Sequence, residues 1–199
     1  MSTVEQTDIQ KIHEQWWKWI FTTKDDVGHP LRGNHAVKQA QNGEYLLAGT
    51  LPKEEKELLQ PERRQIEIPV GASVFIPVDN VLCTETEKDP EPLADACAKA
   101  DIDGAEGKIL ARLNGQELEP NQIIRTRPHT FRLNITQLIK GTRKDKTGEP
   151  LGETGAAADG YCAIFKLPPL LEGKDYHEFE IKGRGIWVTY QISPPAEKQ

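Results

Sequence analysis

Long apolar runs are missing from this sequence. No stretch approaches the roughly 20 residues that a membrane-spanning helix needs, and the N-terminus lacks the basic-then-apolar pattern of a secretion leader. The sequence therefore predicts no membrane segment. Two locations stay open: the cytoplasm for the chain as given, or export with the leader already removed.

Positive charge is also scarce. The chain has 25 Lys and Arg residues against 31 Asp and Glu residues, which gives a net charge of −6. Proteins that bind nucleic acids non-specifically need a surplus of cations to displace the counterions of the phosphates. The composition therefore argues against a nucleic-acid partner.

Catalytic and cofactor motifs are absent as well. The sequence shows no phosphate-binding loop, no cofactor fingerprint and no paired histidines at metal spacing. Its three cysteines, Cys83, Cys97 and Cys162, lack metal spacing, and their odd number leaves at least one thiol unpaired within the chain. We therefore predict neither a cofactor nor a metal. A length of 199 residues suits a single domain, residues 1–199.

What the sequence does contain is one helix followed by many strand signals. Ile9, Ile12, Trp16, Trp19 and Ile20 follow helical spacing, which predicts a helix over 8–22 after a flexible tail, 1–7. A β domain over 43–192 follows, and residues 193–199 form a second tail.

The β domain contains one short helix and about eight strands. The short helix is expected at 93–99. Residues 52–64 are expected to be a solvated loop or a one-turn helix, and residues 140–158 a long flexible loop that is either disordered or functional. The dipeptide Asn114-Gly115 predicts a two-residue hairpin turn. Expected strand segments are 43–49, 64–68, 74–78, 109–113, 129–135, 161–167, 176–182 and 186–192. Turn signals at this spacing predict a mostly β, antiparallel sandwich of jelly-roll type.

Several short islands of sequence carry a family resemblance. They are Trp16-Trp17-x-Trp19, Leu46-Leu47-Ala48-Gly49, Ile68-Pro69-Val70-Gly71, Phe75-Ile76-Pro77-Val78-Asp79-Asn80, Ala96-Cys97-Ala98-Lys99, Asp159-Gly160-Tyr161 and Val188-Thr189-Tyr190. In this order they resemble a family of uncharacterised bacterial proteins, many of which carry export signals. The resemblance implies a β-rich fold and a Cys83–Cys97 disulfide, but no assigned activity.

The tryptophan cluster offers the first candidate site. Trp16 and Trp19 lie on the apolar stripe of the expected helix, whereas Trp17 lies about a third of a turn away. Trp17 could therefore belong to an aromatic platform for a sugar or a cation. The alternative, which aromatic residues at helical spacing favour, is packing against a loop or a second copy of the chain.

Polar residues offer the second candidate site. Asp79 and Asn80 follow an apolar strand, and with Asp159 they could form a polar cluster that binds a ligand; ordinary turn chemistry is the favoured alternative. His129 and His177 lie on expected strands and could converge, although surface or hydrogen-bonded histidines are more common. The acidic segment 101–107 resembles a calcium loop only in part. Cys162 fits a buried thiol better than a nucleophile.

Three classes of function remain open. The favoured one is a non-enzymatic β-sandwich that binds a small molecule, a glycan or a protein partner through Trp17, Asp79, Asn80, His129, Asp159 or His177. The second is an enzyme for a small substrate, such as a lyase, isomerase or hydrolase, with a histidine and a carboxylate in an enclosed pocket. The third is a structural protein that assembles into homo-oligomers through the helix and Trp17.

Overall fold

The computed structural model describes residues 6–23, 29–31, 36–40, 43–50, 60–84, 102, 109–136, 147–184 and 186–196. These residues form one long helix, α1 (Gln6–Thr22), and two β-sheets. Sheet A has the strand order β1-β2-β4-β9-β7, with β8 also paired to β9, and sheet B has the order β3-β11-β10-β5-β6. The expectation of a mostly β sandwich with an N-terminal helix is confirmed.

The strand bounds are as follows. Sheet A contains β1 (Val37–Gln39), β2 (Tyr45–Leu47), β4 (Ser73–Thr84), β7 (Ile123–Arg125), β8 (His129–Ile135) and β9 (Gly152–Lys166). Sheet B contains β3 (Glu62–Glu67), β5 (Leu110–Leu113), β6 (Gln116–Glu117), β10 (His177–Gly183) and β11 (Ile186–Ser193). Most neighbours are antiparallel, but β2 runs parallel to β4 and β3 parallel to β11.

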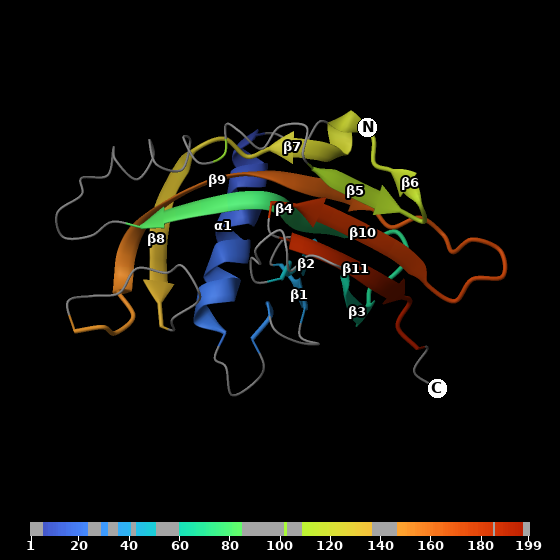
Figure 1. The fold of residues 1–199 in the computed structure, drawn as a ribbon, viewed down its shortest axis with the longest axis horizontal. Coiled ribbons are helices and arrows are strands. Elements are labelled where there is room, and N and C mark those ends of the chain that lie inside the picture. Colours follow the sequence, from blue (N-terminus) through green and yellow to red (C-terminus); the bar gives the residue numbers. More distant parts are fainter. Residues whose placement is uncertain are drawn as a thin grey trace.

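The elements stack in three layers. One buried cluster lies between the two sheets, and it includes Val74, Ile76, Phe179 and Tyr190. A second cluster lies between sheet A and α1. Figure 1 shows β10 and β11 on one side of β4, while α1 crosses β4 and β9 on the other side. Sheet A is therefore covered on both faces, which explains the unbroken apolar run at the start of β4.

Helix α1 is anchored by its apolar side and by a hydrogen bond from Trp16 to sheet A. The side chains of Ile9, Ile12, Trp16 and Ile20 are buried, as the helical spacing predicts. The Trp16 indole N–H donates to the Leu47 carbonyl at 2.7 Å. None of the helices in the described residues is long and apolar enough to cross a membrane.

The hairpin turn is confirmed in detail. Asn114 and Gly115 connect β5 to β6 with φ angles of 53° and 78°, the positive values that this turn type requires. The strand expected at 129–135 is β8 with the same bounds. The strands expected at 176–182 and 186–192 correspond to β10 and β11 within one residue at each end.

Three strand assignments differ from the expectations. Residues 152–158 belong to β9 and not to a loop, and Ala156, Ala157 and Ala158 are buried there. The short strands β1 and β7 were not expected at all. Residues 62–64 of the expected charged loop lie in β3, while residues 51–59 and the short helix expected at 93–99 lie outside the described residues.

Candidate functional site

Asp79 lies inside a strand and not at its end. Strand β4 continues to Thr84, with an irregularity in its register between Pro77 and Asp79. The turn chemistry that the sequence suggested for Asp79 and Asn80 is therefore wrong. Asp79 is 6% exposed, and Arg184 binds its carboxylate side-on with Nε–Oδ2 and Nη2–Oδ1 distances of 2.9 and 3.1 Å. This pair ties the β10–β11 connection to sheet A.

Asp159 lies beside Asp79 in the sheet. Asp79 is opposite Tyr161 on β9, and Asp159 lies two residues before Tyr161 on the same strand. Side chains two residues apart on a strand share a face, so Asp79 and Asp159 are diagonal neighbours on one face of sheet A. Asp159 is fully buried, and Arg125 Nη2 donates to its Oδ2 at 2.6 Å. Asp79 and Asp159 therefore share one face of the sheet, which the less favoured interpretation of the sequence allowed, and each carboxylate is bound by an arginine. The half-buried Asn80 is opposite Gly160 and, by strand alternation, faces the other side.

His177 lies in sheet B, away from the other candidates. Its ring is buried, with Nε2 3.0 Å from the Pro168 carbonyl and Nδ1 3.0 Å from the Asn114 amide. The carbonyl can only accept, so Nε2 carries the proton and Nδ1 accepts from the amide. His177 thus connects the segment that contains Pro168 to the hairpin turn at Asn114. His129 belongs to β8, which lies in the other sheet, sheet A. The structure does not bring the two histidines together.

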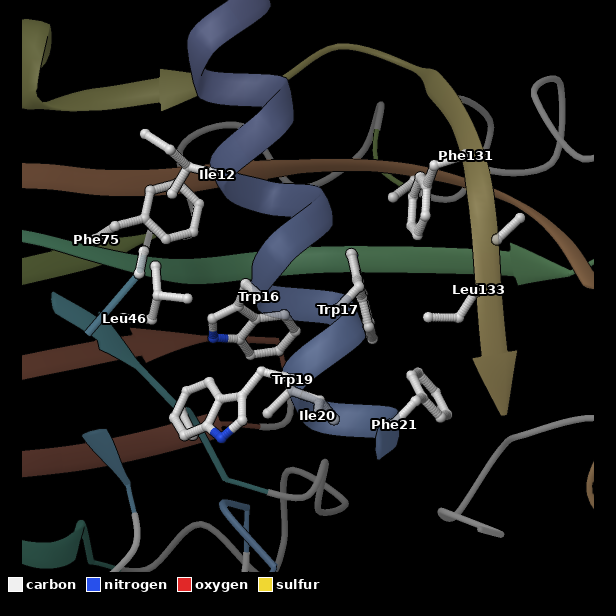
Figure 2. Close-up of a cluster of buried hydrophobic side chains, with 14 of the residues drawn as sticks. Ile12, Trp16, Trp17, Trp19, Ile20, Phe21, Leu46, Phe75, Phe131 and Leu133 are labelled. Carbon is white, nitrogen blue, oxygen red and sulfur yellow. The ribbon is translucent and has the colours of Figure 1, made fainter. Parts of the chain in front are cut away.

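Trp17 lies inside the cluster between α1 and sheet A. It is 8% exposed, with an edge-to-face contact to Trp16 and a stacked contact to Phe21 at ring distances of 4.9 and 5.8 Å. Figure 2 shows Trp17 pointing from α1 toward β8, which carries Phe131 and Leu133. Trp17 therefore does not form the exposed aromatic platform considered from the sequence.

His13 is the unexpected member of the same cluster. Its side chain is completely buried, and neither ring nitrogen has a hydrogen-bond partner among the described residues. The rings of Trp17 and His129 lie 6.0 and 5.3 Å from its own, measured between centroids. Burial, and to a lesser extent the charge of His129, hold the pKa of His13 well below its usual range. His13 is therefore an uncharged imidazole in an apolar layer.

The His13→Leu substitution is expected to stabilise the protein. A buried polar group without a partner costs about 1–3 kcal/mol, and leucine removes that cost while filling a similar volume. Urea unfolding at pH 7 should show a higher free energy of unfolding for this variant. His177→Leu is the matched control and should lower it, because the His177 ring nitrogens are hydrogen-bonded. A loss of stability in His13→Leu would mean that His13 has an unrecognised partner.

Cysteine chemistry follows the sequence expectations where it can be tested. Cys83 is disulfide-bonded, whereas Cys162 is a free, fully buried thiol. Cys97, the partner that the family resemblance implies, lies outside the described residues. Burial, followed by the nearby charge of Asp159, raises the pKa of Cys162 well above its ordinary value. A thiol held in this protonated form is a poor nucleophile.

Counting the reactive thiols tests both the disulfide of Cys83 and the free thiol of Cys162. Denatured but unreduced protein should expose one reactive thiol per chain, and prior reduction should raise the count to three. In the folded protein, Cys162 should react slowly with a thiol reagent at pH 8, because burial and its raised pKa keep the thiolate scarce. Three thiols without reduction would contradict the disulfide.

The outer face of sheet B carries a tryptophan that the sequence argument did not select. Val188, Tyr190 and Ile192 of β11 point into the core, so Trp187 points to the opposite face, where it is half-buried. Its indole N–H donates to Glu180 Oε1 at 2.7 Å, and Lys182 Nζ lies 4.5 Å from the ring centroid. The alternation of inward and outward side chains along 186–192 is the sequence signal that could have placed Trp187 on the outer face.

Polar side chains surround Trp187 and are bonded to one another. Arg112 lies between Glu180 and Glu117, with N–O distances of 3.9 and 3.0 Å. On the next row of the same face, Gln65 Nε2 donates to Gln191 Oε1 at 3.0 Å. We call this set the Trp187 face; it consists of Gln65, Arg112, Glu117, Glu180, Lys182, Trp187, Thr189 and Gln191.

Comparison with known proteins adds no assignment. No protein-family model, curated protein or solved structure matches this chain. No group of three or more metal-ligating side chains occurs in the part of the chain that the structure describes, and the segment 101–107 lies outside it except for Ile102. The argument for function therefore depends on the sites themselves.

Proposed function

We propose that this protein is a non-enzymatic, jelly-roll-like sandwich domain that binds glycans on the Trp187 face. The observation that carries the proposal is an indole held on the outer face of a sheet by Glu180 and Lys182. A tryptophan offers a flat apolar surface together with a polar edge. Such a surface can stack on the C–H face of a sugar ring.

The neighbours of Trp187 suit hydroxyl groups. Glu180, Arg112 and Gln191 end in planar carboxylate, guanidinium and amide groups, which can pair with two adjacent hydroxyls at once. Glu180 and Arg112 are also held in place by their mutual contact. Groups that are already ordered lose less conformational entropy when a ligand binds.

Charge argues against a protein partner on this face. The cores of protein–protein interfaces are depleted of charged side chains, yet Trp187 is bordered by Glu180 and Lys182. A polar ligand such as a sugar can keep these groups hydrogen-bonded, whereas a dry interface would leave them without partners. We therefore favour the glycan among the three ligand classes that the sequence left open.

Export is part of the proposal. Cys83 is disulfide-bonded, and disulfides persist in oxidising compartments outside the cytoplasm. Glycans of cell walls and cell surfaces are found there as well. Of the two locations that the sequence left open, we favour the exported one.

Binding to defined oligosaccharides tests the function. Cellohexaose, xylohexaose, chitohexaose and maltohexaose can each be titrated by calorimetry into the wild-type protein and into Trp187→Ala. We expect at least one sugar to bind, with a loss of at least tenfold in Trp187→Ala. Tyr176→Ala is the matched control, because Tyr176 is 39% exposed and lies outside the Trp187 face. Absence of binding to all four sugars, or equal binding by Trp187→Ala, would contradict the proposal.

A further inference from the structure

His13 is a buried imidazole that lacks an acceptor in the described part of the chain. Its side chain is completely buried, and neither ring nitrogen has a hydrogen-bond partner among the described residues. Buried polar groups in folded proteins nearly always have a partner, so each exception asks for an explanation. Protonation would increase the cost, because a charged imidazole carries protons on both nitrogens and needs two acceptors.

Aromatic rings from two elements surround His13. Trp16 and Trp17 come from its own helix, with ring centroids 6.4 and 6.0 Å away, and Phe75 comes from β4 at 6.3 Å. Such surroundings solvate a charge poorly and so disfavour a protonated imidazole. The attraction of aromatic faces for cations is small beside the cost of removing an ion from water.

The other titratable groups in this layer supply no negative charge. The ring centroid of His129 on β8 lies 5.3 Å from that of His13, and the charge of His129 disfavours a proton on His13. Cys162 of β9 belongs to the same buried cluster. Burial raises the pKa of its thiol, which therefore stays uncharged.

The charged side chains of the surrounding elements lie on other faces. Phe131 and Leu133 of β8 belong to the buried cluster, so Arg132 between them faces away by strand alternation. On β4 and β9, Asp79 and Asp159 share the opposite face of sheet A, where arginines bind them. The charged side chains of α1 pair with one another on its exposed side; they are Asp8, Lys11, Glu14 and Lys18.

We propose that His13 makes the attachment of α1 to sheet A sensitive to acid: protonation of His13 loosens the helix, while the two-sheet sandwich stays folded. Burial first, and the charge of His129 second, hold the pKa of His13 well below its ordinary value of about 6.5. Once α1 has loosened, the imidazole meets water and its pKa returns toward that value. The loosened state then binds the extra proton below about pH 6.5. The attachment is therefore strongest above this pH, and it weakens by up to about tenfold for each pH unit below it.

The helix can loosen by itself because the sandwich does not depend on it. No strand ladder in the described residues includes α1, and the cluster between the two sheets is separate from the cluster under the helix. Side-chain hydrogen bonds connect α1 to the strands and loops of sheet A. Trp16 donates to the Leu47 carbonyl, and Gln6 and Gln10 donate to the Thr126 carbonyl.

Hydrogen exchange followed by mass spectrometry tests the proposal on the full chain at pH 7.5, 6.5, 5.5 and 4.5. After correction for the intrinsic pH dependence of exchange, we expect the protection of the α1 amides to fall by about threefold to tenfold per pH unit below pH 6.5. Peptides from β10 and β11 should keep their protection. His13→Gln introduces a polar side chain that cannot titrate, so its α1 protection should change by less than about twofold per pH unit.

His177→Gln is the matched control, because His177 lies in sheet B and its replacement should leave the pH dependence of α1 unchanged. Four outcomes would overturn the proposal. They are α1 protection that does not change with pH, an equal loss of protection in β10 and β11, the wild-type pH dependence in His13→Gln, and loss of that dependence in His177→Gln. Thermal unfolding at pH 7.5 shows whether each variant is folded. If His13→Gln were unfolded, His13→Leu would replace it, since an apolar side chain at this position is expected to raise stability.

Discussion

Arg64→Met is expected to lower the free energy of unfolding by about 3–5 kcal/mol, because it removes the donor of a buried polar network. Arg64 is 3% exposed although it carries a charge. Its guanidinium donates to the carbonyls of Pro30, Leu31 and Ala48 at 2.7, 3.0 and 3.1 Å, and to Glu62 at 2.8 Å. Methionine fills the space of the side-chain stem but leaves the Pro30 and Leu31 carbonyls without the Arg64 donor, whereas the Ala48 carbonyl still accepts from the Tyr190 hydroxyl.

The neighbouring arginine provides the control. Arg63 precedes Arg64 on β3 and, by strand alternation, faces solvent. Arg63→Met should therefore change stability by less than about 0.5 kcal/mol. Urea unfolding at the same pH measures the free energy of unfolding of both variants. Equal effects of the two substitutions would show that the Arg64 network contributes nothing specific.

Trp17→Ala is expected to lower the free energy of unfolding by about 3–5 kcal/mol, the usual range for truncating a large aromatic side chain in a core. The side chain is 8% exposed, and its ring contacts Trp16 and Phe21. The indole N–H of Trp17 has no hydrogen-bond partner within the described part of the chain, and this reduces the net contribution of Trp17 without reversing it. Chemical denaturation, followed by circular dichroism, measures the difference.

Trp187→Ala is the matched tryptophan substitution. Trp187 lies on the outer face of sheet B, so its removal opens no core cavity and should cost less than about 1 kcal/mol. The two variants thus separate a tryptophan of the core from a tryptophan of the proposed binding face. A loss below about 1 kcal/mol for Trp17→Ala would contradict its place in the core.

Periodicity predicted the elements whose two faces differ in environment. The helix, β8 and β10 each show one buried side and one exposed side, and β11 has one side that is more deeply buried than the other. The sequence placed each of these elements within about two residues. The Asn-Gly hairpin was equally clear, because its backbone angles need particular residues. Local chemistry is sufficient for these features.

Strand β9 shows where local patterns fail. Its first half, Gly152–Ala158, is rich in small residues and has no apolar alternation. It is a strand because β8 supplies backbone partners along 152–158, and β4 supplies partners on the other side for 156–158. The sequence allowed Asp79 and Asp159 to be neighbours. It did not show the arginines that bind them, because Arg125 lies 34 positions from Asp159 and Arg184 lies 105 positions from Asp79.

The sequence by itself determined a mostly β protein with an amphipathic tryptophan-rich helix, because hydrophobic spacing dictates which side of each element is buried. Tertiary structure decided what those elements contact. It buried Trp17 because β8 lies beside α1, and it paired His13 with His129 across a separation of 116 positions. It also left Trp187 on an outer face, since the core lies on only one side of sheet B. Contacts between distant segments depend on how the layers stack, which no local pattern encodes.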